Sequence, residues 1–557
     1  MIKQIKSKTY NYILIICGFI FLVFSPWMNK DSMVVPKVVL LFCLAMFLLP
    51  SIVFEAKTKI RNGVFKALIT ISLLIVFQMV VTVISSEAPI EQQIFGKMGR
   101  GLGFLTLISL IILTLAASFY ANNNNLKFLL ILIVIVFSVS SFYSILQSFG
   151  LDIIKWETRT NAVFGTLGNP NFQAAAAAMV LVPCILVIKR DLKTLLIGLS
   201  LVFLNLYAIY RTVSVQGFIG SAIGISFLIL FFLFYKNKHF FVWGLVLVFT
   251  TLFLSILAML NQGPLKGLSI GPFTFYKPSV QSRGDFWRSA FEAAKDHPFF
   301  GVGIDSFGDY FMEYRDEVAV GHTFSEFTDN SHNYFLEYAV TGGIPLMLLH
   351  TLIVFLTVSS FVKIVRKTQK FEPRIAALFA FWLVFQAQSF ISPGSISLMI
   401  FNSIVTGSLI GISQFQNLPS AIPNTTSKKL QTNRGVLNIF FALLAILFIF
   451  PYFNSDRIYL NALNSRNGDL LVATSKAYPE STLRYSTSSR LLLESKLYEQ
   501  SLDVARSAIE FNPRNVSPWA HILLNPVSTL REKEMAKNML IKLDPNNGGL
   551  KEIKIEG

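Results

Sequence analysis

Charged residues are scarce in this sequence. Asp, Glu, Lys and Arg make up 14% of its 557 residues, and hydrophobic residues make up 53%. A soluble domain carries about 25% charged residues, so this composition excludes an ordinary soluble protein. Long apolar runs fill most of the chain before residue 454. The sequence therefore predicts an all-α, polytopic helical membrane protein with a membrane domain over residues 1–453.

Acidic residues and cysteines are also few. The chain has 31 Asp and Glu against 48 Lys and Arg, a formal net charge of +17. The basic residues gather in short loops beside apolar runs, which indicates contact with anionic lipid rather than nucleic acid. Cys17, Cys43 and Cys184 all lie inside apolar runs. We therefore expect neither a disulfide nor a metal site.

Apolar runs of spanning length predict 12–13 membrane helices. The N-terminal run has no small-residue cleavage site after its basic start, so we expect a retained span. The expected spans lie near residues 11–28, 35–54, 67–85, 102–120, 126–147, 172–188, 194–210, 214–235, 240–260, 341–362, 374–392, 395–415 and 435–453.

The distribution of Lys and Arg over the short loops sets an orientation. Loops on the side of the N-terminus are rich in basic residues, and the opposite short loops hold only a few. By the positive-inside rule the N-terminus is cytoplasmic. The long polar stretch at about 261–340 and the tail 454–557 are then extracytoplasmic, and both assignments would invert if one span upstream were lost.

The tail, residues 454–557, is polar and helical in pattern. Residues 498–515 resemble the second helix and turn of a tetratricopeptide repeat. Pro479, Pro513 and Pro545 are spaced 34 and 32 residues apart, near the period of that repeat. The alternative is a general helical-hairpin domain. As a repeat array, so short a tail is expected to pack on the membrane domain or on a protein partner.

Polar side chains that can carry chemistry gather in the long outer stretch. His332 stands where this stretch meets the tenth apolar run, and an imidazole there can act as a general base near neutral pH. Asp329 and Asn333 can orient the ring or bind a sugar hydroxyl. The alternative is that this segment only caps and anchors the following helix.

Arg283 and Arg288 open a predicted amphipathic helix that runs to Asp296. Their five-residue offset places the two guanidinium groups on different faces of the helix. A guanidinium fork matches a diphosphate, and Arg283 is the favoured ligand. Anchoring to lipid headgroups is the alternative for both.

Two earlier segments also place polar residues at the outer ends of spans. Asn169 and Asn171 precede the sixth span, where they can cap the helix or contact a sugar. Arg211 and Gln216 lie between the seventh and eighth spans, and polar residues at such edges often mark substrate paths. These segments are expected to converge on the same site as the long outer stretch.

Taken together, these motifs resemble the O-antigen ligase and polymerase family, which includes bacterial protein O-oligosaccharyltransferases. The motifs are Gly-Asn-Pro-Asn before the sixth span, Arg-Gly-Asp-Phe-Trp, His-Pro-Phe-Phe-Gly-Val-Gly, and Ser-His-Asn-Tyr before a glycine-rich bend. The architecture corresponds over roughly residues 10–415. The specific signal is confined to 165–172 and 281–345.

The resemblance implies a metal-independent, cofactor-free glycosyltransferase in the bacterial cytoplasmic (inner) membrane. It would move a glycan from a polyprenyl-diphosphate carrier such as undecaprenyl diphosphate to an acceptor hydroxyl on a lipid, a glycan or a protein. Carried over by position, His332 is the base and Arg283 a diphosphate ligand. The family's Ser-Arg-Gly corresponds here to Ser214-Val-Gln216-Gly217, so Arg211 or Gln216 would have to replace the missing arginine.

Two other classes of protein fit parts of the sequence. One is a transporter of a lipid-linked glycan or a small anion, although the spans hold few charges at their centres. The other is a non-catalytic membrane scaffold with a repeat domain. Cleavage of the donor that depends on the acceptor discriminates the enzyme from both.

Overall fold

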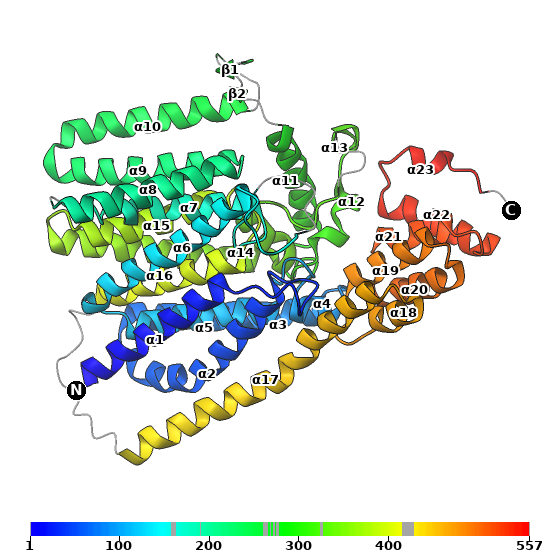
Figure 1. Ribbon diagram of the computed structural model, residues 1–557, viewed down its shortest axis with the longest axis horizontal. Helices are drawn as coiled ribbons and strands as arrows, with labels where there is room; N and C mark the ends of the chain where they lie inside the picture. Colours follow the sequence, from blue (N-terminus) through cyan, green and yellow to red (C-terminus); the bar gives the residue numbers. More distant parts are fainter. Residues whose placement is uncertain are drawn as a thin grey trace. The chain divides into compact units, whose positions relative to one another are not determined.

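Helices dominate the computed structural model, which describes residues 2–156, 163–189, 191–259, 264, 266–267, 269–270, 273–274, 278–322, 327–414 and 428–555 (Figure 1). Each of the thirteen expected spans coincides with a helix. Among the described residues, nine helices are long and apolar enough to cross a membrane, and three shorter ones are apolar. The prediction of a polytopic helical membrane protein is confirmed.

The chain divides into two compact units. Unit 1 comprises Met1–Leu22, Thr114–Gly284 and Val354–Ser420. Its complete elements are α1 (Ile2–Leu22), η1 (Asn123–Asn125), α6 (Leu126–Ser148), α7 (Pro170–Ile185), α8 (Leu192–Arg211), α9 (Val215–Lys236), α10 (Lys238–Met259), β1 (Ser269–Ile270), β2 (Phe273–Thr274), α15 (Pro373–Ser389) and α16 (Ile396–Gln414).

Small side chains let α7 and α9 approach closely at the centre of unit 1. The alanine run of α7 is fully buried. A Cβ added at Gly217 of α9 would lie 2.9 Å from the Cβ of Ala174, and one at Gly220 would lie 3.1 Å from the Cβ of Ala178. Close backbone approach through small residues is the usual basis of helix association in lipid.

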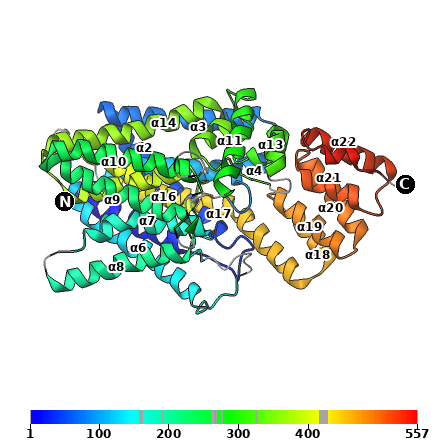
Figure 2. The same cartoon turned by 90° about the horizontal axis from the view of Figure 1, so that it is seen from above.

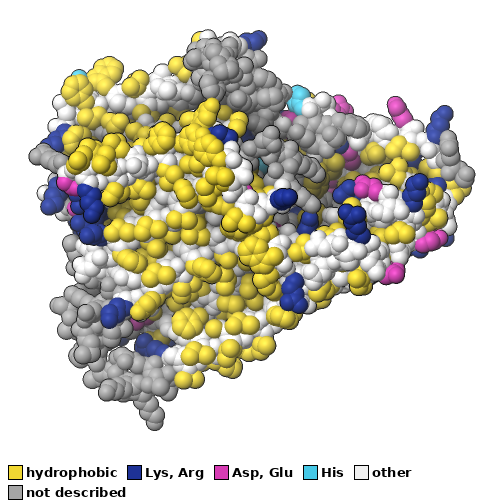
Figure 3. All heavy atoms as spheres, in the orientation of Figure 1, with side chains coloured by type: hydrophobic (Ala, Val, Ile, Leu, Met, Phe, Trp, Pro, Cys, Tyr) yellow, Lys and Arg dark blue, Asp and Glu magenta, His cyan; other side chains and the backbone are white. Residues whose placement is uncertain are grey.

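Most of the exposed side chains of α10 are apolar, and hydrophobic side chains cover much of the upper part of the molecule in Figure 3. The exposed side chains include Phe240, Val242, Trp243, Val246, Leu247, Phe249, Leu252 and Phe253. Such a surface would be unfavourable in water over this length. It indicates that α10 faces lipid.

Unit 2 comprises Val23–Leu113, Asp285–Ile353 and Ala421–Gly557. Three helices continue from one unit into the other: α5 (Phe104–Tyr120), α11 (Pro278–Asp296) and α14 (Tyr334–Thr368). The remaining elements of unit 2 are α2 (Val35–Lys59), α3 (Gly63–Ser85), α4 (Ile90–Phe95), η3 (Phe307–Asp309), α12 (Phe311–Tyr314), α13 (Glu317–His322), α17 (Lys428–Ser465), α18 (Gly468–Ser475), α19 (Thr482–Glu494), α20 (Tyr498–Phe511), α21 (Val516–Leu524), α22 (Leu530–Leu543) and α23 (Gly549–Glu552).

The long outer stretch is more ordered than the sequence suggested. Most of residues 260–277, and residues 323–326, lie outside the described residues. The amphipathic helix α11 begins at Pro278, five residues before Arg283. After it, η3, α12 and α13 follow as short helices. Before it, β1 and β2 pair as two-residue antiparallel strands.

A bend in α14 locks it to the turn at 297–303. Gly343 has φ 81° and interrupts the helix, as the Gly-Gly-Ile-Pro sequence predicted. A Cβ at Gly343 would lie 2.3 Å from the carbonyl oxygen of Phe299. The Gln78 side chain of α3 donates to the carbonyl oxygens of Phe299 (2.6 Å) and Gly342 (2.9 Å). Only glycine can occupy a backbone this close.

In the tail, α19 packs on α20 and α21 packs on α22 (Figure 2). The helix and turn expected at 498–515 are present as α20 and the segment after it. Ser501 and Ala508 are buried in α20. The indole of Trp519 donates to the carbonyl oxygen of Pro513 at 2.8 Å. The tetratricopeptide assignment stays a prediction.

Candidate functional site

A small apolar core fixes the outer segments that carry His332. Phe286 and three alanines of α11 pack with Phe307, Tyr310 and Phe311 and with Ala339 and Val340 of α14. The ring of Phe286 also contacts the imidazole of His332, with centroids 5.4 Å apart. The amphipathic pattern of α11 therefore buries its apolar face against the histidine-bearing turn.

Hydrogen bonds brace the turn at 328–333 from within. The backbone N–H of His332 donates to Oδ1 of Asn330 at 2.9 Å, and the N–H of Ser331 donates to Oε2 of Glu337 at 2.8 Å. Asn333 caps α14 by accepting from the N–H groups of Phe335 and Leu336, both at 3.1 Å. Asn333 therefore caps this helix, whereas the sequence had suggested Asn330 or Ser331 for that role.

His332 itself has φ 55°, the left-handed region that a non-glycine residue rarely adopts. The bracing of the turn holds it there. Backbone strain of this kind gathers at functional sites, where the surrounding structure over-determines the conformation. This supports a functional rather than a purely anchoring role for the residue.

Asp329 is ion-paired on the same turn. Its two oxygens accept from Nε and Nη2 of Arg100, each at 2.8 Å. Burial opposes the charge on Asp329, but the Arg100 guanidinium outweighs it and lowers the pKa of the carboxyl to about 2. His332 and Lys97 also favour the carboxylate. Asp329 is therefore negative at neutral pH, and its charge acts on His332.

On α11, Arg283 and Trp287 are one turn apart and project from the same face. Nε of Arg283 and Nε1 of Trp287 are both buried, and among the described residues neither has a hydrogen-bond acceptor. Burial lowers the pKa of Arg283 without any carboxylate to offset it. Two buried N–H donors without acceptors are costly unless a ligand accepts from them.

Arg288 differs from Arg283 as the helical offset predicted. Its side chain is 49% exposed, and it donates to Asp316 at 2.7 Å and to Asp285 at 2.7 Å. These carboxylates already occupy the guanidinium fork. Nothing in this geometry supports a contact between Arg288 and substrate.

Unit 1 brings together the two earlier polar segments. Asn169 caps α7 by accepting from the N–H of Asn171 at 2.8 Å. Oδ1 of Asn171 accepts from Oγ of Ser214 at 2.7 Å. The segments at 165–172 and 211–217 thus meet. Both asparagine side chains have structural partners, which weakens the prediction that they bind a sugar.

Arg211 and Gln216 border this meeting point. Arg211 donates to the carbonyl oxygen of Ser148 at 3.1 Å and lies 3.4 Å from the hydroxyl of Tyr207. Gln216 donates to the carbonyl oxygen of Ile391 at 3.2 Å, while no described residue donates to its buried Oε1. Within the described part of the chain, both of these partners of Arg211 are neutral groups, so its charge remains available to an anion.

Sequence reasoning overlooked Arg100 and Lys97. Both lie in Gly96-Lys-Met-Gly-Arg-Gly-Leu-Gly103, and Nζ of Lys97 pairs with Asp309 at 3.1 Å. The available signal was two cations on a short outer loop, where the positive-inside rule disfavours them. Their position among four glycines indicated that both side chains belong to a structured turn and are not simply surface charges.

Within the described residues, no group of three His, Cys, Asp or Glu side chains is arranged to hold a metal ion.

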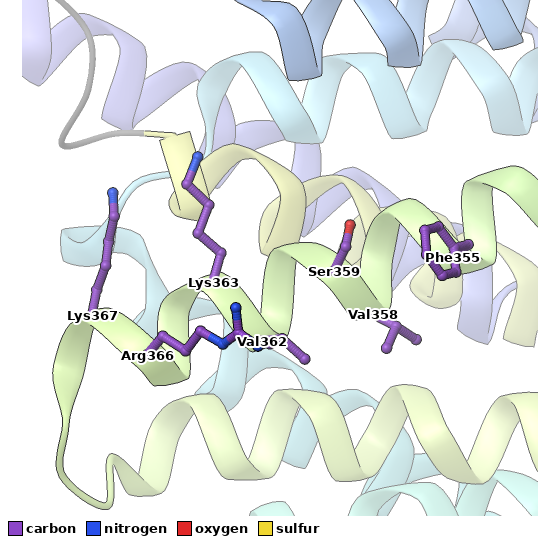
Figure 4. Close-up of a pocket in the computed structure, with 7 residues that line it drawn as sticks. All are labelled: Phe355, Val358, Ser359, Val362, Lys363, Arg366 and Lys367. Carbon is purple, nitrogen blue, oxygen red and sulfur yellow. The ribbon is translucent and has the colours of Figure 1, made fainter.

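A hollow of about 470 Å³ lies apart from this site and runs along the end of α14 (Figure 4). Its lining is apolar at one end and basic at the other: Phe355, Val358, Ser359, Val362, Lys363, Arg366 and Lys367.

The fold defines a multi-pass helical membrane protein with polar chemistry gathered at the ends of its helices. Residues 200–351 match a family model described as O-Antigen ligase. The match includes Arg211, Gln216, Arg283 and His332. Over residues 200–351 the chain is similar to the O-antigen ligase family. No curated protein matches the chain.

Proposed function

We propose that this protein transfers a glycan from a polyprenyl-diphosphate carrier to an acceptor hydroxyl, at the outer face of the cytoplasmic membrane and without a metal ion. The observation that carries the proposal is the braced turn at 328–333, which holds both His332 and the ionised Asp329. The family match over residues 200–351 supports glycan transfer as the reaction class.

His332 is the general base in this proposal. Its imidazole takes the proton of the acceptor hydroxyl as the hydroxyl oxygen attacks the anomeric carbon. The bond between that carbon and the diphosphate oxygen breaks, and the electron pair leaves with the carrier diphosphate. Attack opposite the leaving group inverts the anomeric configuration. The imidazolium then releases its proton to water, which restores the base.

Arg283 binds the leaving diphosphate. Its buried Nε, together with Nε1 of Trp287 on the same face of α11, supplies two donors for phosphate oxygens. A charge-assisted bond neutralises the diphosphate as negative charge develops, so no acid is needed on the leaving side. Arg211 takes the place of the family arginine that this sequence lacks.

The basic end of the hollow along α14 supports the orientation. Lys363, Arg366 and Lys367 lie at the C-terminal end of this span (Figure 4). By the positive-inside rule that end is cytoplasmic, and the turn at His332, before the other end of α14, is then extracytoplasmic. The diphosphate of a lipid carrier lies at headgroup depth, within reach of side chains at the ends of spans.

Transfer by purified protein in lipid vesicles tests the proposal. With a polyprenyl-diphosphate glycan and a candidate acceptor, release of carrier diphosphate should depend on the acceptor. His332→Gln and Arg283→Gln should each lower the rate by about 100-fold or more. His239→Gln and Arg490→Gln, exposed residues outside the site, are matched controls that should retain activity.

Three outcomes contradict the proposal. Full activity in His332→Gln would show that His332 is not the general base. Movement of the glycan across the vesicle without bond cleavage identifies a transporter. Loss of glycan output on deletion of the tail, with both point variants active, identifies a scaffold. Parallel assays with lipid, glycan and peptide acceptors distinguish the three acceptor classes.

A further inference from the structure

The turn at 96–103 is built to present two cations to the outer stretch. Gly96, Gly99 and Gly101 have φ values of 88°, 90° and 62°, which side-chain-bearing residues rarely adopt. The resulting backbone path aims the N–H groups of Lys97 and Leu102 at one oxygen of Asp305, at 2.7 and 3.1 Å. A buried carboxyl group thus fixes the turn to the outer stretch.

Arg100 projects from this turn onto Asp329. The guanidinium makes two parallel hydrogen bonds to the two carboxylate oxygens, the geometry that gives such a pair both strength and a defined orientation. The pair is largely shielded, with 16% of the Arg100 side chain and 29% of the Asp329 side chain exposed. Lysine cannot reproduce the two-pronged contact.

We propose that Arg100 is a positioning residue for the transfer reaction: its fork fixes the Asp329 carboxylate within the braced turn that also carries His332, and from there the carboxylate stabilises the protonated imidazole. The inference rests on the proposed base role of His332 and adds to it a residue distant in sequence. Arg100 acts through Asp329 and does not contact the reacting atoms.

Proton transfer explains why both partners are needed. When His332 takes the proton of the acceptor hydroxyl, positive charge appears on the ring, and a nearby carboxylate lowers the energy of that state. Arg100 keeps its own proton and makes protonation of Asp329 unfavourable, so the proton stays on the imidazole. Without Arg100, the carboxylate loses both its fixed position and its protection from protonation.

Several other charged groups belong to this neighbourhood. Lys97 is paired with Asp309, Asp305 accepts from the turn backbone, and Glu337 of α14 accepts from Ser331. Asp305 and Glu337 act electrostatically on Arg100, and each also acts on or responds to Asp329. These groups are unchanged in the variants below, so differences between variants report the Arg100–Asp329–His332 relationship.

Two variants with opposite electrostatic signs test the inference. Removal of the carboxylate in Asp329→Asn disfavours the imidazolium, so the acid limb of the rate profile moves to lower pH. Removal of the cation in Arg100→Gln favours the imidazolium, so the acid limb of the rate profile moves to higher pH. We expect each shift to be about one pH unit. Loss of orientation should lower kcat by about 100-fold, with little change in KM for the donor.

Arg100→Lys supplies the rescue variant. It keeps the charge and loses the fork, so its acid limb should match that of the unaltered protein while kcat recovers only in part. Arg506→Gln is the matched control, because it removes an arginine–carboxylate pair with Glu532 at the tail surface. It should change neither kcat nor the pH profile.

An NMR titration of labelled histidine in the full-length protein gives a second readout that does not need activity. The signal of His332, assigned by its loss in His332→Gln, should titrate at lower pH in Asp329→Asn and at higher pH in Arg100→Gln. If both titrations and both rate profiles match those of the unaltered protein, Arg100 is only structural, and the base role of His332 is unaffected. If His332→Gln remains active, the proposed function itself fails.

Discussion

Arg315 and Asp544 form a buried ion pair between the outer stretch and the tail. Nε of Arg315 lies 2.8 Å from Oδ1 of Asp544, and Nη2 lies 2.5 Å from Oδ2. The two side chains are 0% and 3% exposed. Asn546 also donates to the carbonyl oxygen of Arg315 at 2.7 Å. The tail is thus joined to the segment after α12 by charges that water does not reach.

Removal of one partner of this pair should loosen the tail strongly. Arg315→Met leaves Asp544 buried without its cation, which should cost about 3–5 kcal/mol. Hydrogen–deuterium exchange in α22 measures the effect locally. The double variant Arg315→Met/Asp544→Leu should recover most of the protection, because an apolar pair avoids the isolated charge.

The surface pair Arg506–Glu532 is the control for this experiment. Its arginine is 50% exposed, so Arg506→Ala should cost no more than about 1 kcal/mol. Equal exchange rates in Arg315→Met and Arg506→Ala would mean that the buried pair does not hold the tail.

Gly343→Ala should destabilise the bend in α14 beyond the cost of its backbone angle. A Cβ there meets the Phe299 carbonyl oxygen at 2.3 Å, whereas Gly150, with φ 70°, has open space around its Cβ position. Gly150→Ala therefore reports only the left-handed conformation, at about 1–2 kcal/mol. Thermal unfolding of both variants compares the two costs, and similar midpoints would contradict the packing of α14 on the 297–303 turn.

Asp305 predicts a pH dependence of stability. Burial raises its pKa to about 7 from the usual 3.8, and Asp329 adds to the rise. Because the folded pKa is the higher one, protonation stabilises the fold below pH 3.8, and this contribution is lost as pH rises towards about 7. Unfolding midpoints of the unaltered protein relative to Asp305→Asn should fall over that range. A constant difference would show that Asp305 is already ionised.

The sequence was most informative where local pattern decides the outcome. Thirteen apolar runs, the Asn169 cap and the Gly343 bend each follow from composition or from a few neighbouring residues, and each is present. The different environments of Arg283 and Arg288 also follow from helical periodicity. The face of α11 that carries Arg283 could therefore be distinguished from the face that carries Arg288 by sequence alone.

Pairings between distant segments were not readable in the same way. Arg100 meets Asp329 across 229 residues, and Arg315 meets Asp544 across 229 residues. No local pattern specifies such partners, because any exposed carboxylate could satisfy a guanidinium. Arg288 is a further example. Its ion pair with Asp316 makes it unavailable to a ligand, and the spacing in the sequence did not indicate this pair.

A chelator should leave the proposed transfer unchanged. Arg283 and Trp287 supply the donors for the diphosphate, so no divalent cation is needed to neutralise it. Assays with and without EDTA, after dialysis into metal-free buffer, measure this directly. A rate that collapses with EDTA and returns with Mg²⁺ or Mn²⁺ would show that a metal bridges the diphosphate. In that case Arg283→Gln should lower the transfer rate less than EDTA does.

Labelling of introduced cysteines tests the orientation of the chain. Cys17 and Cys184 are buried and Cys43 is half-buried in α2, so the native thiols give little background. Lys367→Cys marks the basic end of α14, and Glu534→Cys marks the exposed surface of α22. A membrane-impermeant maleimide should label Glu534→Cys in spheroplasts and Lys367→Cys only in inside-out vesicles. The opposite pattern would put both the tail and the histidine turn in the cytoplasm, where an externally displayed glycan donor could not reach His332.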